Sequence, residues 1–269
     1  MLRSIAAKTL RDLRRGFVMW SAGLVGLVAM MQSVYPSIRH NEQINQLLKS
    51  YPDAMKGLIA FGGPLDYTSA PGYLGAELFS FMVPLLLIVA TVGAGSRAIA
   101  GEEDRGTLDL LLALPVRRER VLLEKALALV VEVVALGCVL WLSLWVGAVV
   151  IDMHISGPHL AAGTASATLL AMVFGSLALL IGAVAGHRGA GLAIGLTSAV
   201  AVSTYLLNAL APLATVLSGP QKLSPFYYYA SSDPLRRGLD AGNAAVLAGV
   251  TVLMIAIAVL AIRRRDLAV

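Results

Sequence analysis

Charge and cysteine are both scarce in this sequence. Only 14% of the 269 residues are charged, whereas about 25% is usual in soluble domains. Hydrophobic residues make up 58%, which is more apolar surface than a soluble core of this size can enclose. The single cysteine, Cys138, excludes an intrachain disulfide and a cluster of thiolate metal ligands. We therefore expect an all-α integral membrane protein that uses the lipid bilayer as part of its solvent.

Motifs for nucleotide binding and hydrolysis are also missing. The sequence has no Gly-x-x-x-x-Gly-Lys-Ser/Thr loop to hold nucleotide phosphates, and no Gly-x-Ser-x-Gly nucleophile motif. The glycine-rich run that begins at Gly186 lacks the lysine and lies in a very short connection. The net charge of +5 does not indicate nucleic-acid binding, because the basic residues lie beside apolar segments, as juxtamembrane anchors do.

Six apolar stretches are long enough to cross a bilayer, which takes about 20 residues of helix. None of the six contains Lys or Arg. We expect one transmembrane domain over residues 17–269, with an outer loop at 36–75, an inner loop at 97–125 and an outer re-entrant or surface-lying segment at 212–240. The predicted spans are residues 17–35, 76–96, 126–151, 161–185, 190–211 and 241–262.

The distribution of basic residues predicts the orientation in the membrane. If both termini are cytoplasmic, fifteen of the 21 Lys and Arg residues lie on the inner side, and the other six lie outside. Positive charge favours the cytoplasmic side of a membrane. The first span is too long for a signal peptide, and Met30-Met31-Gln32 offers no small-residue cleavage site. We expect a multi-pass protein of a prokaryotic cell membrane.

Residues 1–16 have the pattern of an amphipathic helix. Apolar residues such as Leu2, Ile5, Leu13 and Phe17 fall on one side of a helical wheel. Such a helix lies along the membrane surface, with its basic face toward anionic headgroups. The alternative is a simple positively charged anchor. The basic residues of the opposite face are Arg3, Lys8, Arg11, Arg14 and Arg15.

The inner loop contains a short predicted helix. Thr107 can cap its first turn, Asp109 suits the positive end of the helix dipole, and Pro115 ends it. Arg117 and Arg118 then lie where positive charge favours a helix C-terminus. A helix of about two turns is unstable alone and needs a surface to dock against. The alternative is a solvated charged loop whose leucines rest on the bilayer.

The run Arg105-Gly-Thr-Leu-Asp-Leu-Leu-Leu-Ala-Leu-Pro-Val-Arg-Arg, with Leu122-Leu-Glu-Lys125 after it, resembles the signature of ABC exporter permeases of the type-2 superfamily. That family has approximately Gly-Thr-Leu-Glu-x-Leu-Leu, then Pro-Val-Ser-Arg, and later Gly-Lys. This chain departs from the pattern at Asp109, Arg117 and Glu124, which replace Glu, Ser and Gly. The resemblance extends over essentially the whole chain.

The resemblance implies that residues about 102–118 form a coupling helix in a cleft of a separate cytoplasmic ATPase. Two ATPase copies would bind ATP and magnesium, so no cofactor is expected in this chain, and the N-terminal helix would contact the same partner. A second permease subunit, identical or related, would complete an export pathway. The residues implied in coupling are Glu102, Glu103, Arg105, Gly106, Thr107, Leu108, Leu111, Leu112, Pro115, Arg117 and Arg118.

A few polar residues fall inside the predicted spans, where they are costly and often functional. Glu132 either faces a transport path or pairs with Lys125 or Arg97. Asn208 could line a path, although interhelical hydrogen bonding is the more common role.

Two other function classes remain as alternatives at this stage. A secondary transporter or channel without an ATPase would require inverted repeats and more charge inside the membrane. A membrane-embedded metal-dependent enzyme could use Asp152, His154 and His159, since a carboxylate and two imidazoles can bind zinc. Their spacing matches no helical pair, so a surface loop with incidental histidines is the favoured interpretation.

Overall fold

The computed structural model describes residues 5–39, 41–51, 66–103, 117–185, 189–213, 216 and 219–264. Within these ranges the regular structure is helical, and six helical segments are long and apolar enough to cross a membrane. This confirms the predicted all-helical class and the number of candidate spans. The six segments are α1 (Ile5–Ile38), Ala70–Ala98, α8 (Arg118–Val150), α9 (Gly157–Ala185), α10 (Gly189–Leu210) and α13 (Ala241–Arg264).

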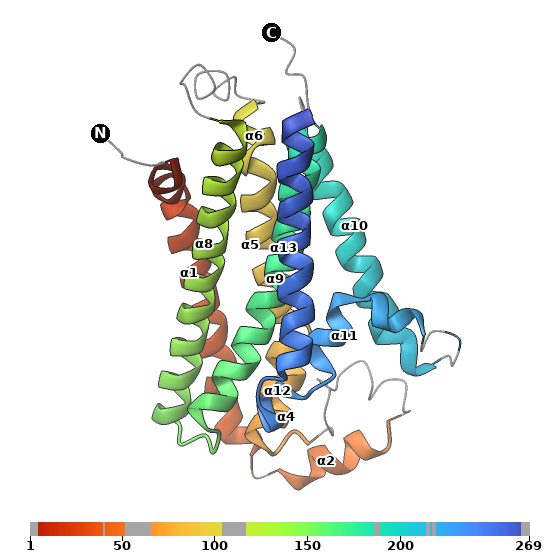
Figure 1. Cartoon of the computed structure of the whole chain (residues 1–269). Helices are drawn as coiled ribbons and strands as arrows, with labels where there is room; N and C mark the ends of the chain where they lie inside the picture. The colour runs from red at the N-terminus through yellow and green to blue at the C-terminus, as the bar shows by residue number, and fades with distance from the viewer. Residues whose placement is uncertain are drawn as a thin grey trace.

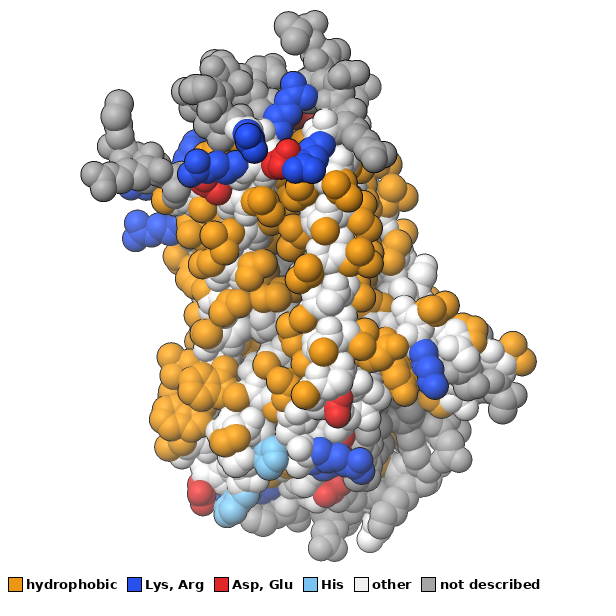
Figure 2. All heavy atoms as spheres, in the orientation of Figure 1, with side chains coloured by type: hydrophobic (Ala, Val, Ile, Leu, Met, Phe, Trp, Pro, Cys, Tyr) orange, Lys and Arg blue, Asp and Glu red, His pale blue; other side chains and the backbone are white. Residues whose placement is uncertain are grey.

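The six long segments form one bundle, in which the start of α1 and the end of α13 lie at the same end (Figure 1). We call this end the α6 end, after the short helix α6 (Ala100–Glu103) that lies there, and the opposite end the α12 end, after α12 (Pro234–Arg237). Figure 2 shows apolar side chains along the middle of the bundle and charged side chains gathered toward the two ends. This distribution matches a protein that crosses a bilayer.

Several helices extend beyond the apolar stretches that predicted them. Helix α8 begins at Arg118, eight residues before the predicted span, and the described part of α1 begins at Ile5. Helical hydrogen bonding continues through polar residues, whereas hydropathy detects only the part that faces lipid. The sequence predicted Arg117 and Arg118 only as residues that follow the short helix of the inner loop. The structure places them at the start of α8.

The second span changes helix type along its length. It runs from α4 (Ala70–Leu74) through the π-helix η1 (Gly75–Met82) into α5 (Val83–Ala98). Pro84 lies in the first turn of α5, directly after the π-helix. A proline is tolerated in a first helical turn because its missing N–H has no intrahelical partner to bond there.

The centre of the bundle is the contact between α5 and α9. In α9, 67% of the most apolar stretch is buried inside the chain, against 17% in α10. Gly95 and Gly175 let the two backbones approach closely: a Cβ atom on Gly95 would lie 2.3 Å from the carbonyl oxygen of Gly175. The Thr91 hydroxyl crosses the same contact and donates to the carbonyl of Ala171 at 3.0 Å.

Two glycines of α10 have no such close neighbour in this chain. A Cβ atom on Gly191 or Gly195 would meet nothing within 4 Å, so these glycines of α10 face open space in this chain. The short connection that contains Gly186 lies outside the described residues.

The segment before the last span folds back against the bundle. It holds η2 (Ala211–Leu213), η4 (Pro220–Leu223), α11 (Pro225–Ala230) and α12. Two aromatic residues of α11, Phe226 and Tyr229, are buried. The Tyr229 hydroxyl donates to the Phe79 carbonyl at 2.7 Å, which joins this segment to the second span.

The first loop of the α12 end contains the short helix α2 (Glu42–Lys49). The Asn41 side chain caps it by accepting from the Gln43 backbone N–H. Residues 52–65 of the same loop lie outside the described residues.

Helix α1 joins the predicted interfacial segment and the first span without a break in its hydrogen bonding. Figure 1 shows its first turns nearly end-on, whereas the rest runs along the bundle. Arg11, Arg14 and Arg15 are exposed. Leu13 and Phe17, expected to face lipid, instead pack against the bundle core. The position of this segment on a membrane surface stays a prediction.

The Gly95–Gly175 contact leads to a stability prediction. We expect Gly95→Ala to lower the free energy of unfolding by about 1–3 kcal/mol, because the added methyl group overlaps a backbone atom of α9. Gly191→Ala is the matched control, since its methyl group enters open space and alanine favours helix. SDS-induced unfolding in mixed micelles measures both variants. Equal stability of the two variants would contradict the close contact.

Candidate functional site

The α6 end brings together the two borders of the inner loop. Helix α6 ends at Glu103, and α8 begins at Arg118, so residues 104–116 connect two described helices. Lys, Arg, Asp and Glu side chains gather at this end of the bundle (Figure 2). Three carboxylates here bind groups on other helices.

Glu102 and Lys125 form an ion pair between α6 and α8. The Lys125 side chain is only 1% exposed, and its ammonium group also donates to the carbonyl of Ala98 at the end of α5. A buried ammonium group is stable only where such partners replace its water. The pair therefore joins α6, where the inner loop begins, to α8, where the loop ends.

Glu124 binds the beginning of α1 from the neighbouring helix α8. Its Oε2 atom accepts hydrogen bonds from the backbone N–H groups of Ile5 and Ala6 at 2.6 and 3.1 Å. The first N–H groups of a helix have no partner within the helix, and the helix dipole favours a negative charge beside them. Arg120 holds the other oxygen of Glu124 at 2.9 Å. Glu124 thus acts as a capping group supplied from 118 positions away in the sequence.

Glu119 extends the same arrangement to the last span. Its Oε2 atom lies 2.6 Å from Arg263 Nη2, near the end of α13. Both side chains are partly exposed, so this contact contributes less than the buried Lys125 pair. The first two turns of α8 nevertheless contact α1, α6 and α13 through Glu124, Lys125 and Glu119.

The predicted coupling residues divide into two groups. Glu102 and Glu103 lie in α6, and Arg117 and Arg118 are exposed at the start of α8. The predicted short helix, with its capping threonine and its leucines, lies outside the described residues and stays a prediction. Eight residues named from the sequence lie outside the described part. They are Arg3 of the predicted interfacial helix and the coupling residues Arg105, Gly106, Thr107, Leu108, Leu111, Leu112 and Pro115.

The intramembrane polar residues have distinct environments. Lys125, one of the predicted partners of Glu132, binds Glu102 instead. Glu132 is 7% exposed, and its Oε2 atom has no hydrogen-bond partner among the described residues. Asn208 accepts a hydrogen bond from Gln221 in η4 at 3.1 Å, a contact that connects α10 to the segment after it.

Gln32 illustrates the interhelical role expected for most such residues. Its amide nitrogen donates to the Leu144 carbonyl at 2.9 Å and so joins α1 to α8. The side chain is 3% exposed. Because hydrocarbon offers no hydrogen-bond partner, a buried amide of this kind bonds across helices.

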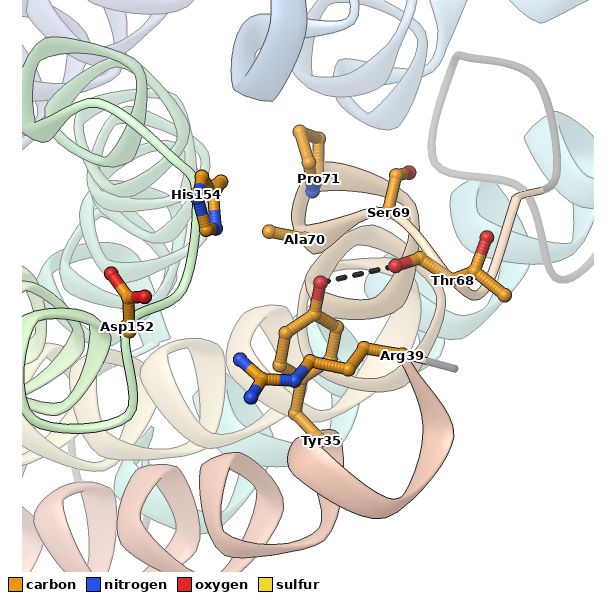
Figure 3. Close-up of a pocket in the computed structure, with 8 residues that line it drawn as sticks. All are labelled: Tyr35, Arg39, Thr68, Ser69, Ala70, Pro71, Asp152 and His154. Carbon is orange, nitrogen blue, oxygen red and sulfur yellow. Dashed lines mark hydrogen bonds between the residues drawn. The ribbon is translucent and has the colours of Figure 1, made fainter. Parts of the chain in front are cut away.

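A second polar region lies at the α12 end, around a cavity of about 480 Å³. Figure 3 shows Asp152 and His154 on one loop, facing the end of α1 with Tyr35 and Arg39 across the cavity. The Tyr35 hydroxyl donates to the Thr68 carbonyl at 3.0 Å. Arg39 donates to the Ile151 carbonyl at 3.4 Å.

The enzyme interpretation placed a metal in this region. His159 bonds the Ser156 hydroxyl through Nδ1 at 2.7 Å, and it lines a neighbouring cavity of about 350 Å³ with His154. Within the described ranges no group of three His, Cys, Asp or Glu side chains is placed to hold a metal ion. Asp152, His154 and His159 therefore do not form a metal centre by themselves.

Close to this cavity, Tyr67 donates its hydroxyl to Glu77 at 2.8 Å. Burial, and then the bond to the Glu77 carboxylate, raise the pKa of Tyr67 above its ordinary value. Tyr67 is therefore neutral and acts as a hydrogen-bond donor, which holds the loop before α4 against the start of the second span.

Six apolar helices between two charged ends define a multi-pass membrane protein. The chain belongs to the ABC-2 family of transporter proteins, whose family model, described as "ABC-2 family transporter protein", matches residues 3–267. This confirms the resemblance to the type-2 permease family over almost the whole chain. Membership places the chain among membrane transport proteins.

A curated relative is consistent with this assignment. The chain is 33% identical over 105 residues to the "Probable ABC transporter permease protein NosY" of Stutzerimonas stutzeri. The match covers 30% of this chain and 37% of that relative. It supports the permease class and carries nothing more specific, because most of both proteins lies outside it.

Two contacts were not predicted from the sequence: that of Glu119 with Arg263, and that of Glu124 with the start of α1. Glu124 had one detectable signal: it replaces a glycine of the family pattern at a position where a carboxylate is otherwise unexplained. The contacts of Glu119 with Arg263 join residues 144 positions apart, and nothing local in the sequence indicates them.

The buried ion pair gives a second stability prediction. We expect Lys125→Met to lower the free energy of unfolding by about 3–5 kcal/mol, because it leaves the Glu102 carboxylate, which is 12% exposed, without the Lys125 ammonium group. Adding Glu102→Gln to this variant should recover part of the loss. Arg120→Gln, at a side chain that is 70% exposed, should cost less than about 1 kcal/mol. SDS-induced unfolding compares these three variants and the single variant Glu102→Gln, and full additivity of the two pair substitutions would contradict a direct interaction.

The capping contact gives a prediction for hydrogen exchange. Glu124→Ala removes the acceptor of the Ile5 and Ala6 N–H groups, and losing a cap typically costs about 1 kcal/mol. We expect roughly five- to tenfold faster amide exchange in the first turns of α1, measured by mass spectrometry. Arg120→Gln is the control, since it frees the other oxygen of Glu124 but leaves the cap in place. Unchanged exchange in Glu124→Ala would show that the contact does not hold the helix start.

Proposed function

We propose that this chain is the membrane-spanning permease subunit of an ATP-driven exporter. Its coupling helix lies within residues 102–118 and docks in a cleft of a cytoplasmic ATPase. ATP and magnesium are bound by two ATPase subunits, and two permease subunits form the pathway. The observation that carries the proposal is the family match over residues 3–267, together with the absence of a nucleotide-binding loop from the sequence.

The contacts at the α6 end support a coupling role for the inner loop. The loop leaves α6 beside Glu102 and enters α8, whose first turns contact α6, α1 and α13. A displacement of the loop by an ATPase therefore acts on several spans at once. Such a displacement biases the bundle between inward-open and outward-open states to the extent that the ATPase binds the two states differently.

The proposed orientation places the α6 end in the cytoplasm of a prokaryotic cell. The basic residues favour it, because fifteen of 21 then lie on the inner side. The exposed arginines of the first turns of α1, Arg11, Arg14 and Arg15, suit contact with anionic lipid headgroups or with the same ATPase.

The pairing of two permease subunits is supported by α10. Only 17% of its most apolar stretch is buried in this chain, and the small residues Gly191 and Gly195 lie on open surface. Small residues of this kind permit close approach of a helix from another subunit.

The secondary-transporter alternative is disfavoured by family membership, because the family works with ATPase partners. The enzyme alternative rests on Asp152, His154 and His159, which do not form a metal centre by themselves within the described residues.

The test is affinity purification of the tagged chain from its native membrane, followed by mass spectrometry. We expect a stoichiometric ATPase subunit. Leu111→Asp should abolish its recovery and uncouple transport while the chain stays inserted, because a charge in the docking face opposes burial. Leu239→Asp, at an exposed leucine of the α12 end, is the matched control and should retain the ATPase. Recovery of the wild-type chain alone would contradict the proposal.

A further inference from the structure

A cavity of about 360 Å³ lies between α1, α5 and α8, toward the α6 end of the bundle. Its wall includes Trp20 from α1, Ala90 from α5, and Leu129 and Glu132 from α8. The three helices lie on the same side of the bundle in Figure 1. A volume of this size is typical of sites that enclose a small organic molecule.

Glu132 is the charged group of this cavity that lies deepest along α8. The residue is 7% exposed, and its Oε2 atom is buried without a hydrogen-bond partner among the described residues. An ionisable side chain in a membrane span is costly, and this carboxylate lacks the partners that usually compensate for its burial. The Oε2 atom of Glu132 is therefore open to a hydrogen-bonding partner from outside the chain, either a proton or a cation.

Two cations of α5 and α8 line the cavity together with Glu132: Lys125 is paired with Glu102, whereas Arg97 bonds a neutral carbonyl and acts on Glu132 only through space. Lys125 binds Glu102 and the Ala98 carbonyl. Arg97 donates from Nε to the Gly93 carbonyl at 2.7 Å, and its side chain is exposed. No ion pair joins Glu132 to either of them in the part of the chain that the structure describes.

The remaining wall favours an organic cation over a bare proton. A proton needs no cavity to bind. The cavity beside Glu132 is lined by the indole of Trp20, by Leu129 and by the methyl groups of Ala90 and Ala94. A carboxylate and an indole ring that line one cavity can together recognise an organic ammonium group, through charge and through cation–π attraction. The exposed residues Asp12 and Arg15 border the same cavity, which therefore extends from Glu132 to the surface of α1.

We propose that this cavity binds an organic ammonium group carried on an apolar body, with Glu132 as its counter-ion and Trp20 as its aromatic contact. That the bound molecule is transported cargo rests on the proposed function; binding itself does not require it. An amine of this kind comes either from a free organic cation or from the headgroup of an aminophospholipid.

The probe for the test is ethidium, an aromatic quaternary ammonium ion whose fluorescence rises in apolar surroundings. The full-length chain is studied in nanodiscs of phosphatidylglycerol, without an ATPase. We expect saturable binding that Glu132→Gln weakens by at least about tenfold, since the substitution removes the charge and keeps the shape. Glu77→Gln, at a carboxylate of the second span outside this cavity, is the control and should bind as the wild type does.

A second pair of variants tests the cavity without touching the carboxylate. Gly16 lines the cavity, and a Cβ atom there would meet nothing within 4 Å, so Gly16→Leu should fill space without disturbing the fold. We expect it to weaken ethidium binding by at least about fivefold. Gly23→Leu, on the same helix, also in open space and outside the cavity, should not.

Ethidium binding within twofold of wild type in both Glu132→Gln and Gly16→Leu would overturn the proposal, as would the absence of saturable binding to the wild type. Competition by phosphatidylethanolamine would show that the site binds the headgroup of an aminophospholipid. Lack of competition would show that it binds free organic cations only. Both outcomes support the site. Because no ATPase is present, the result is independent of whether an ATPase copurifies with the chain.

Discussion

The hydrocarbon interior of a bilayer supplies no hydrogen-bond partner, and this constraint governs the whole structure. Every backbone N–H and C=O group must be satisfied within the protein, which requires helices across the membrane. Several polar side chains inside the spans obey the same rule. Thr164, Thr168 and Ser176 bond carbonyls of their own helix, and Gln32 and Thr91 bond carbonyls of another. Ser21, Glu132 and Thr197 each have a buried oxygen without a hydrogen-bond partner among the described residues. Of these three, only Glu132 can carry a charge, and it is the one for which we propose a ligand.

The number of spans could be predicted from the sequence because hydropathy measures the property that lipid selects. The ends of the helices could not be predicted equally well. Helix α8 begins eight residues before its apolar stretch, where its polar first turns carry Glu119 and Glu124. The π-helix η1 was not predicted either, since its residues have the same apolar character as those of an ordinary helix. Hydropathy therefore locates the membrane-facing part of a helix and misses the part that makes ionic contacts.

The candidate site shows the same division. Glu102 and Lys125 were both named from the sequence, but their pairing depends on how the ends of α5 and α8 approach each other, which no local pattern encodes. For Glu132 the sequence left open a partner or a path, and only the geometry assigns Lys125 to Glu102. The apolar residues Leu13 and Phe17 were assigned to lipid because a helical wheel cannot distinguish a lipid-facing side from one that packs on a neighbouring helix.

The contact between Gly95 and Gly175 has a consequence for how the bundle can move. Two helices whose backbones touch without intervening side chains cannot rotate or slide past each other without a clash. Helices α5 and α9 therefore form a rigid pair, and any rearrangement of the bundle moves them together. The displacement is left to α1 and α10, which have the smallest buried share among the six spans. The peripheral helices α1 and α10 are thus the spans whose packing inside this chain opposes displacement least.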